Sequence, residues 1–139
     1  MYDLVLAGGE AILPGKGNTS CEIGIKDGKI KDFGQISEKA KNIIDAKGLT
    51  VLPGCIDTQT HFREPGSTDT EDLNSGSRAA VAGGITAVFE MPNTNPPTSN
   101  MKEFQRKLDL AKNRMYCNYA FYFGAVSYTH LTLPTILRV

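Results

Sequence analysis

From residue 49 onward, short apolar runs alternate with helix-like stretches, and this alternation restricts the possible folds more than any other feature. Strands are expected over Leu49–Asp57, Ile85–Phe89 and Cys117–Ala125, and helices over Ser75–Ala82 and Ser99–Met115. Strands joined in turn by helices form parallel sheets. Such strands are buried on both faces, so they read as near-continuous apolar runs, as Ile85–Phe89 does. The sequence therefore predicts an α/β fold over residues 51–125.

Sequence signals support both expected helices: boundary residues mark the ends of the first, and an apolar face marks the second. The first has small residues at helical spacing, is preceded by Asp69, Glu71 and Asp72, and stops at Gly83-Gly84. Negative charge at an N-terminus and glycine at a C-terminus are typical helix boundaries. The apolar face expected for the second helix consists of Met101, Phe104, Leu108 and Ala111 or Met115.

Residues 1–50 lack this alternation and read as short strands separated by turns. Tyr2–Ala7 and Ala11–Leu13 flank Gly8-Gly9, which predicts a hairpin. Asp27-Gly28 separates two further runs and is a strong signal for a type I′ hairpin, because both central residues need positive φ. We expect a small β-sandwich segment here, with no evident chemistry of its own.

The composition excludes several classes of function. The chain has 15 Lys+Arg and 15 Asp+Glu, so no basic excess indicates nucleic acid. No stretch approaches the roughly 20 apolar residues of a membrane span, and the N-terminus lacks the charge pattern of a signal peptide. The 3 cysteines are widely spaced and odd in number, which argues against a disulfide framework. A reduced, cytoplasmic protein that acts on small molecules is expected.

The segment Asp57–Gly66 places four polar side chains at alternate positions after an apolar approach: Asp57, Gln59, His61 and Arg63. Side chains alternate along a strand, so these four are expected to share one face. They would lie at the carboxyl end of a strand, where α/β barrels place their catalytic groups. The alternative is a surface edge strand with an incidental histidine, which the buried, parallel character of the preceding run disfavours.

This segment resembles the signature of dihydroorotases, cyclic amidohydrolases of the amidohydrolase superfamily. The similarity is close over about residues 49–100 and includes Gly83-Gly84-Ile85-Thr86. Arg63-Glu64-Pro65-Gly66 together with Met91-Pro92-Asn93-Thr94 favours dihydroorotases over allantoinases and hydantoinases. The resemblance implies the first three strands of a metal-dependent (β/α)8 (TIM) barrel, preceded by a β-sandwich segment.

The resemblance also implies roles for individual residues. His61 would bind a metal, with Zn²⁺ as the expected ion and one or two ions per subunit. Arg63 and Asn93 would hold the substrate carboxylate, since a guanidinium gives a bidentate, charge-assisted grip and an amide adds a neutral donor. A loop-capping role is the alternative for Asn93, and Asp57 would be supporting. The family's catalytic aspartate and carboxylated lysine come from later strands, so no catalytic residue is expected within residues 1–125.

Gln59 departs from the family pattern, because it stands where the family has its first metal-binding histidine. An amide oxygen is a weaker zinc ligand than an imidazole nitrogen. Three consequences are open: Gln59 binds the metal with reduced affinity, the site holds one ion instead of two, or the protein is a non-catalytic relative. Retention of Arg63 and Asn93 favours an active enzyme.

The implied reaction is the reversible ring opening of (S)-dihydroorotate to N-carbamoyl-L-aspartate in pyrimidine biosynthesis. Another cyclic amidase, an allantoinase or a dihydropyrimidinase (hydantoinase), is the first alternative. The second is a non-catalytic dihydroorotase-like subunit that binds aspartate transcarbamoylase. The resemblance is also compatible with a homodimer. No nucleic acid or membrane partner is expected.

Residues 126–139 break the pattern. Val126–Thr135 reads as the translation of GTC TCT TAT ACA CAT CTG ACG CTG CCG ACG, a string that resembles a transposase-type sequencing adaptor. We therefore expect these residues to be adaptor-derived and His130 not to be a ligand. With 139 residues against the roughly 250 of a full barrel, the chain alone is expected to be an inactive fragment that aggregates or stays molten. A sharp melt of a soluble monomer would contradict this.

Overall fold

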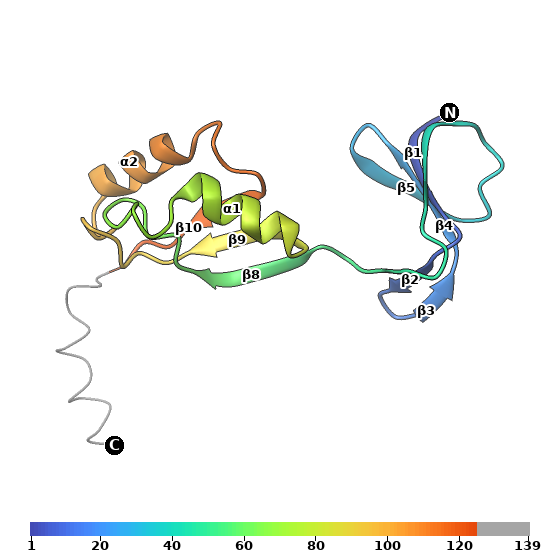
Figure 1. Ribbon diagram of the computed structural model, residues 1–139, viewed down its shortest axis with the longest axis horizontal. Coiled ribbons are helices and arrows are strands. Elements are labelled where there is room, and N and C mark those ends of the chain that lie inside the picture. Colours follow the sequence, from blue (N-terminus) through green and yellow to red (C-terminus); the bar gives the residue numbers. More distant parts are fainter. Residues whose placement is uncertain (125–139) are drawn as a thin grey trace, which may run out of the picture. The chain divides into compact units, whose positions relative to one another are not determined.

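A computed structural model describes residues 1–124, and it divides the chain into two compact units. The first unit is Met1–Pro53 and the second starts at Gly54. The observed boundary therefore lies three residues after the boundary that the sequence predicts, at residue 50. Figure 1 shows a small all-β unit and an α/β unit. The stretch expected to be adaptor-derived, residues 126–139, lies outside the described residues.

The first unit contains two sheets. The larger has the order β5-β4-β1-β6 and the smaller the order β3-β2-β7. The larger sheet consists of β1 (Tyr2–Ala7), β4 (Glu22–Lys26), β5 (Lys29–Gly34) and β6 (Ala40–Asp45). The smaller consists of β2 (Glu10–Leu13), β3 (Gly17–Ser20) and β7 (Thr50–Val51). Both sheets contribute apolar side chains to a hollow of about 370 Å³, among them Leu6, Ile12, Ile25 and Phe33.

One predicted hairpin of this unit is confirmed and the other is wrong. β4 and β5 pair antiparallel around Asp27 and Gly28, whose φ angles of 52° and 68° are those a type I′ turn needs. β1 and β2 do not pair, since β1 joins β4 and β6 whereas β2 joins β3 and β7. At Gly8-Gly9 the chain crosses from one sheet to the other. Glycine is required because a Cβ on Gly9 would lie 2.9 Å from the Cβ of Ala46.

The second unit confirms the predicted α/β alternation. The expected first strand, Leu49–Asp57, is divided, because Thr50–Val51 pairs with β2 in the first unit and the parallel sheet begins at Cys55. Its sheet has the order β10-β9-β8, with both pairings parallel. Both helices lie on the same side of this sheet (Figure 1). The elements are β8 (Cys55–Thr60), α1 (Leu73–Ala82), β9 (Ile85–Glu90), α2 (Met101–Ala111) and β10 (Asn118–Phe121). Among the described residues, no helix has the length and apolar character needed to cross a membrane.

Side-chain caps explain where the helices begin. The Asp72 carboxylate accepts a hydrogen bond of 2.6 Å from the Ser75 amide, and the Ser75 hydroxyl oxygen accepts one of 3.1 Å from the Asp72 amide, which completes a capping box. This cap lowers the pKa of Asp72, and it starts α1 two residues before the predicted Ser75. Asn100 caps α2 by accepting from the Glu103 amide at 3.0 Å, so α2 begins after the predicted Ser99. It ends at Ala111, before the predicted Met115.

The core of the second unit lies between the sheet and the helices. It is built on Phe62, Leu73, Val88, Ala111 and Phe121. The predicted apolar face of α2 is partly wrong. Met101 is 69% exposed because it occupies the first turn of the helix, whereas Lys107 is fully buried. The core-facing stripe is therefore Phe104, Lys107, Leu108 and Ala111.

Gly76 allows α1 to approach Phe62, which follows β8. A Cβ at Gly76 would lie 2.5 Å from the Phe62 ring. We expect Gly76→Ala to lower the free energy of unfolding by about 1–3 kcal/mol, the usual cost of overpacking, although alanine is the better helix former. Denaturant unfolding of the full-length protein measures this. The exposed Arg78→Ala serves as control, and Gly76→Ala with Phe62→Leu should recover most of the loss. Unchanged stability of Gly76→Ala would contradict the close contact.

Candidate functional site

The carboxyl edge of the parallel sheet brings together two residues that the sequence singles out. His61 follows β8 directly and Asn93 lies in the loop after β9. The Nδ1 atom of His61 lies 2.9 Å from the Oδ1 atom of Asn93, across 32 positions of sequence. His61 is half-buried and Asn93 is exposed. Parallel strands end at a common edge, and this explains why the two loops meet.

Backbone hydrogen bonds hold the two loops against each other. The Met91 amide donates to the Thr60 carbonyl at 2.9 Å, which continues the pairing of β8 and β9 beyond Glu90. The Asn95 amide donates to the Pro65 carbonyl at 2.9 Å, and this bond joins the two loops directly. The relative position of His61 and Asn93 is therefore set by main-chain bonds as well as by their own side chains.

Asp57 does not follow the predicted alternation that would place it on one face of the strand with Gln59, His61 and Arg63. The register of β8 on β9 shifts between Asp57 and Thr60, which pair with Val88 and Glu90. Three steps along β8 thus match two along β9, and such a bulge breaks the strict alternation of faces. Asp57 stabilises the irregular segment, because its Oδ1 atom accepts the Gln59 amide at 2.9 Å. Asp57 lies inside β8, and its supporting role stays a prediction.

Arg63 also departs from the predicted alternation, because β8 ends at Thr60. Its φ is 64°, in the left-handed region that non-glycine residues seldom adopt. Its carbonyl accepts the Ser67 amide at 3.0 Å, so the backbone turns sharply here. The side chain is exposed, and within residues 1–124 its guanidinium makes no ion pair. A guanidinium in this state is available to an anionic ligand.

The donor atoms near His61 fit part of a zinc site. Within the described residues the Nε2 atom of His61 makes no hydrogen bond, and neutral imidazole is a usual zinc ligand. Gln59 is exposed and offers an amide oxygen. The described residues contain no group of three or more His, Cys, Asp and Glu side chains placed to hold a metal. Since zinc takes about four ligands, this region can contribute ligands but not complete a site.

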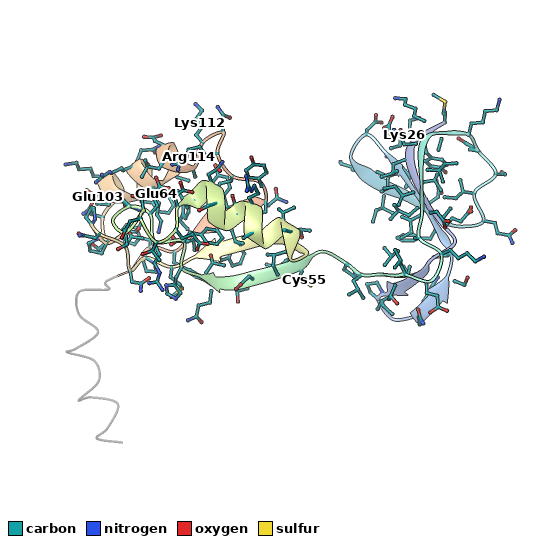
Figure 2. All side chains as sticks on the ribbon, in the orientation of Figure 1. Lys26, Cys55, Glu64, Glu103, Lys112 and Arg114 are labelled. Atoms are coloured by element: carbon teal, nitrogen blue, oxygen red, sulfur yellow. The ribbon has the colours of Figure 1, made fainter. Side chains whose placement is uncertain are left out.

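Glu64 belongs to the site region, although sequence reasoning assigned it no role of its own. It is 7% exposed. Its carboxylate accepts the Leu73 amide at the start of α1 at 2.9 Å, and it forms a two-pronged ion pair with Arg114 at 2.8 and 3.0 Å. Figure 2 shows the two side chains lying together. The carboxylate raises the pKa of Arg114. The Arg-Glu-Pro-Gly motif indicated Glu64, whereas no local signal indicated Arg114.

A second unpredicted ion pair lies beneath the loop of Asn93. Glu90, the last residue of β9, pairs with Lys107 of α2, and both side chains are buried. Lys107 also donates to the Met91 carbonyl at 2.9 Å and lies 5.1 Å from the Phe121 ring centroid. Burial raises the pKa of Glu90 and lowers that of Lys107, and the attraction between the two charges opposes both shifts. The pair anchors the start of the loop.

Known proteins resemble this chain in sequence. Residues 50–132 match the family model described as "Amidohydrolase family". An allantoinase of Salmonella choleraesuis (strain SC-B67) is 41% identical over 128 residues, which are 91% of this chain and 28% of the relative. An allantoinase of Escherichia coli O1:K1 / APEC matches with the same identity and coverage. The chain thus spans about 28% of the length of these curated relatives.

Solved structures resemble the fold. An L-hydantoinase (dihydropyrimidinase) from Arthrobacter aurescens matches with a TM-score of 0.82 and 28% identity, over 99% of this chain and 31% of that protein. A D-hydantoinase (dihydropyrimidinase) from Thermus sp. matches with a TM-score of 0.73 and 27% identity, over 96% of this chain and 30% of that protein. Both matches extend through the β unit and the α/β unit.

Proposed function

Because this chain belongs to the amidohydrolase family, we propose that the full-length protein is a metal-dependent hydrolase that opens the ring of a cyclic amide at a carbon–nitrogen bond. One observation carries the proposal: His61 and Asn93 meet at 2.9 Å at the carboxyl edge of a parallel sheet. This edge is where α/β barrels place their active sites. The relatives named allantoinase and the structures named hydantoinase support a ring amide as the substrate.

The α/β unit is proposed to be the first part of a (β/α)8 barrel. Its three strands are parallel and neighbouring, and the helices that connect them lie on one side of the sheet. In a barrel that side is the outer surface, covered by the ring of helices. The residues that complete the site would then come from strands of the full-length protein that follow β10.

Zinc is the proposed metal, with one or two ions. The Nε2 atom of His61 would be a ligand and Gln59 a weaker one through its amide oxygen. Zinc, when bound, acts as a Lewis acid and makes water nucleophilic at neutral pH. His61 and Gln59 would hold the metal, and Arg63 and Asn93, the latter in contact with His61, would orient the substrate.

Dihydroorotate is the proposed substrate, and N-carbamoyl-L-aspartate the product of its ring opening. The exposed guanidinium of Arg63 and the amide of Asn93 can grip the carboxylate that this ring carries. Allantoin is the second candidate, and the 41% identity to proteins named allantoinase favours it. Allantoin has no carboxylate, so binding of dihydroorotate would require Arg63 whereas binding of allantoin would not.

Substitution of Arg63 separates these candidates. We expect Arg63→Gln to lower kcat/KM for dihydroorotate about 10–100-fold, since a hydrogen bond to a charged group contributes about 1.5–3 kcal/mol. Hydrolysis of allantoin should change little. The assay uses the full-length, zinc-loaded protein with dihydroorotate, allantoin and a hydantoin, and Arg78→Gln on the exposed side of α1 is the matched control.

Each result of this assay has a defined meaning. Turnover of allantoin alone would replace dihydroorotate by the second candidate, and turnover of the hydantoin alone would indicate a dihydropyrimidinase. Tight binding of dihydroorotate without turnover at any zinc loading would overturn the enzyme proposal. It would favour a non-catalytic subunit, which co-purification with aspartate transcarbamoylase would test. The homodimer and the cytoplasmic location stay predictions.

A further inference from the structure

We propose that Asn93 is a positioning residue for the metal centre, whose amide oxygen holds His61 in the tautomer that leaves Nε2 free to bind zinc. The inference rests on the proposed function, because it takes His61 as a metal ligand. It assigns to Asn93 a role besides the grip on the substrate.

The hydrogen bond between the two side chains determines the tautomer. A carbonyl oxygen only accepts, so the contact of 2.9 Å between Oδ1 and Nδ1 requires a proton on Nδ1. Neutral imidazole carries one proton, and its Nε2 lone pair is then free. The opposite amide orientation would have Nδ2 donate to Nδ1, which would put the proton on Nε2 and block the metal. Histidine ligands generally donate their second N–H to such an acceptor.

The loop that carries Asn93 is held on both sides by hydrogen bonds within this chain, which place its backbone beside His61. Before Asn93, the Met91 amide and carbonyl bond to Thr60 and Lys107, both at 2.9 Å. After it, the Thr98 amide donates to the Pro92 carbonyl at 2.9 Å and closes the loop. A ligand orientation preorganised in this way reduces the loss of rotational freedom when the metal binds.

The hydrogen bond to His61 also determines which atom of the Asn93 amide remains for the substrate. With Oδ1 occupied by His61, the two protons on Nδ2 are the remaining donors of Asn93. Within the described residues Nδ2 makes no hydrogen bond, so it is available to a substrate anion. One side chain would therefore orient the metal ligand with its oxygen and bind substrate with its nitrogen.

Two substitutions of Asn93 in the full-length protein separate these atoms. Asn93→Leu removes the acceptor at similar volume, whereas Asn93→Asp keeps an acceptor and removes the donor. The zinc dissociation constant is measured without substrate, by competition with a chelator. We expect Asn93→Leu to weaken zinc binding about 10–100-fold, as loss of such a partner usually does, and Asn93→Asp to stay within about threefold of the wild type. Asn95→Ala, an exposed position in the same loop, should match the wild type.

Nitrogen NMR of His61 in the metal-free protein is the independent readout. The wild type and Asn93→Asp should show a protonated Nδ1, and Asn93→Leu a mixture of tautomers. Equal zinc affinity in wild type and Asn93→Leu, or a wild type with the proton on Nε2, overturns the inference. A wild type that binds no zinc overturns the proposed function instead, while the metal-free NMR comparison still decides whether Asn93 sets the tautomer.

Discussion

Replacing Lys107 by methionine is expected to lower the free energy of unfolding of the full-length protein by about 3–5 kcal/mol, the usual result of removing one partner from a buried ion pair. Methionine fills a similar volume, so we expect the lost charge, and not a packing defect, to cause the effect. Glu90 would remain as a buried carboxylate without its cation, and the Met91 carbonyl would lose its donor. Denaturant unfolding at pH 7 measures the effect.

The pH dependence of this variant identifies the cause. Burial already raises the pKa of Glu90 above its ordinary value of 4.5, and Lys107 opposes that shift. Without Lys107 the folded-state pKa rises further. A group whose pKa is higher in the folded state stabilises the folded protein at pH values below its unfolded-state pKa. That stabilisation is lost as the pH rises through the folded-state pKa. The destabilisation by Lys107→Met should therefore shrink as pH falls towards 4.5.

Two controls complete the experiment. Lys102→Met removes an exposed ammonium from the same helix, and should change the stability by less than about 0.5 kcal/mol. The double variant Glu90→Leu with Lys107→Met removes both charges and should recover most of the loss, because apolar replacements of buried ion pairs are often neutral. A double variant as unstable as Lys107→Met alone would show that packing, not the unpaired charge, is the cause.

The buried lysine marks where the sequence could not predict the fold. The alternation of strands and helices is local information, and it correctly predicted the parallel sheet and both helices of the α/β unit. Helical periodicity treats lysine as a solvent-facing residue. Lys107 faces the core only because Glu90, from another element, supplies a partner. Likewise, Gly8-Gly9 is indistinguishable from a hairpin turn until the pairing of β1 with β6 is known.

The sequence identified which residues meet at the candidate site, but it did not predict how their side chains are arranged. The motif placed His61 and Asn93 in the same site, and the structure brings them into contact. Strand periodicity placed Asp57 and Arg63 on the face of His61, but a bulge intervenes in one case and a left-handed turn follows the strand in the other. Neither irregularity leaves a signal in a single sequence, because no glycine marks them. Arg114 lies 50 positions from Glu64, beyond any local pattern.

The second large effect is expected at Glu64, which connects the site to the helices. Glu64→Ala removes the acceptor of the Leu73 amide and the partner of Arg114. We expect the free energy of unfolding to fall by about 2–4 kcal/mol, because hydrogen bonds to charged groups contribute about 1.5–3 kcal/mol each and Arg114 keeps partial access to solvent. Since Glu64 follows Arg63 directly, the substrate grip should weaken as well, and KM for the ring substrate should rise.

Matched variants show whether the ion pair or the helix cap dominates. Glu64→Gln keeps one acceptor oxygen, which can serve the Leu73 amide and one arm of Arg114, but it loses the charge and turns an NH2 donor towards the other arm. It should therefore retain part of the stability lost in Glu64→Ala. Arg114→Lys keeps the charge but cannot form the two-pronged contact. Asp69→Asn, an exposed position in the same loop, is the control. If Glu64→Ala and Glu64→Gln are equally unstable while Arg114→Lys is neutral, the charge of Glu64 carries the effect, and the two-pronged geometry of the contact with Arg114 contributes nothing.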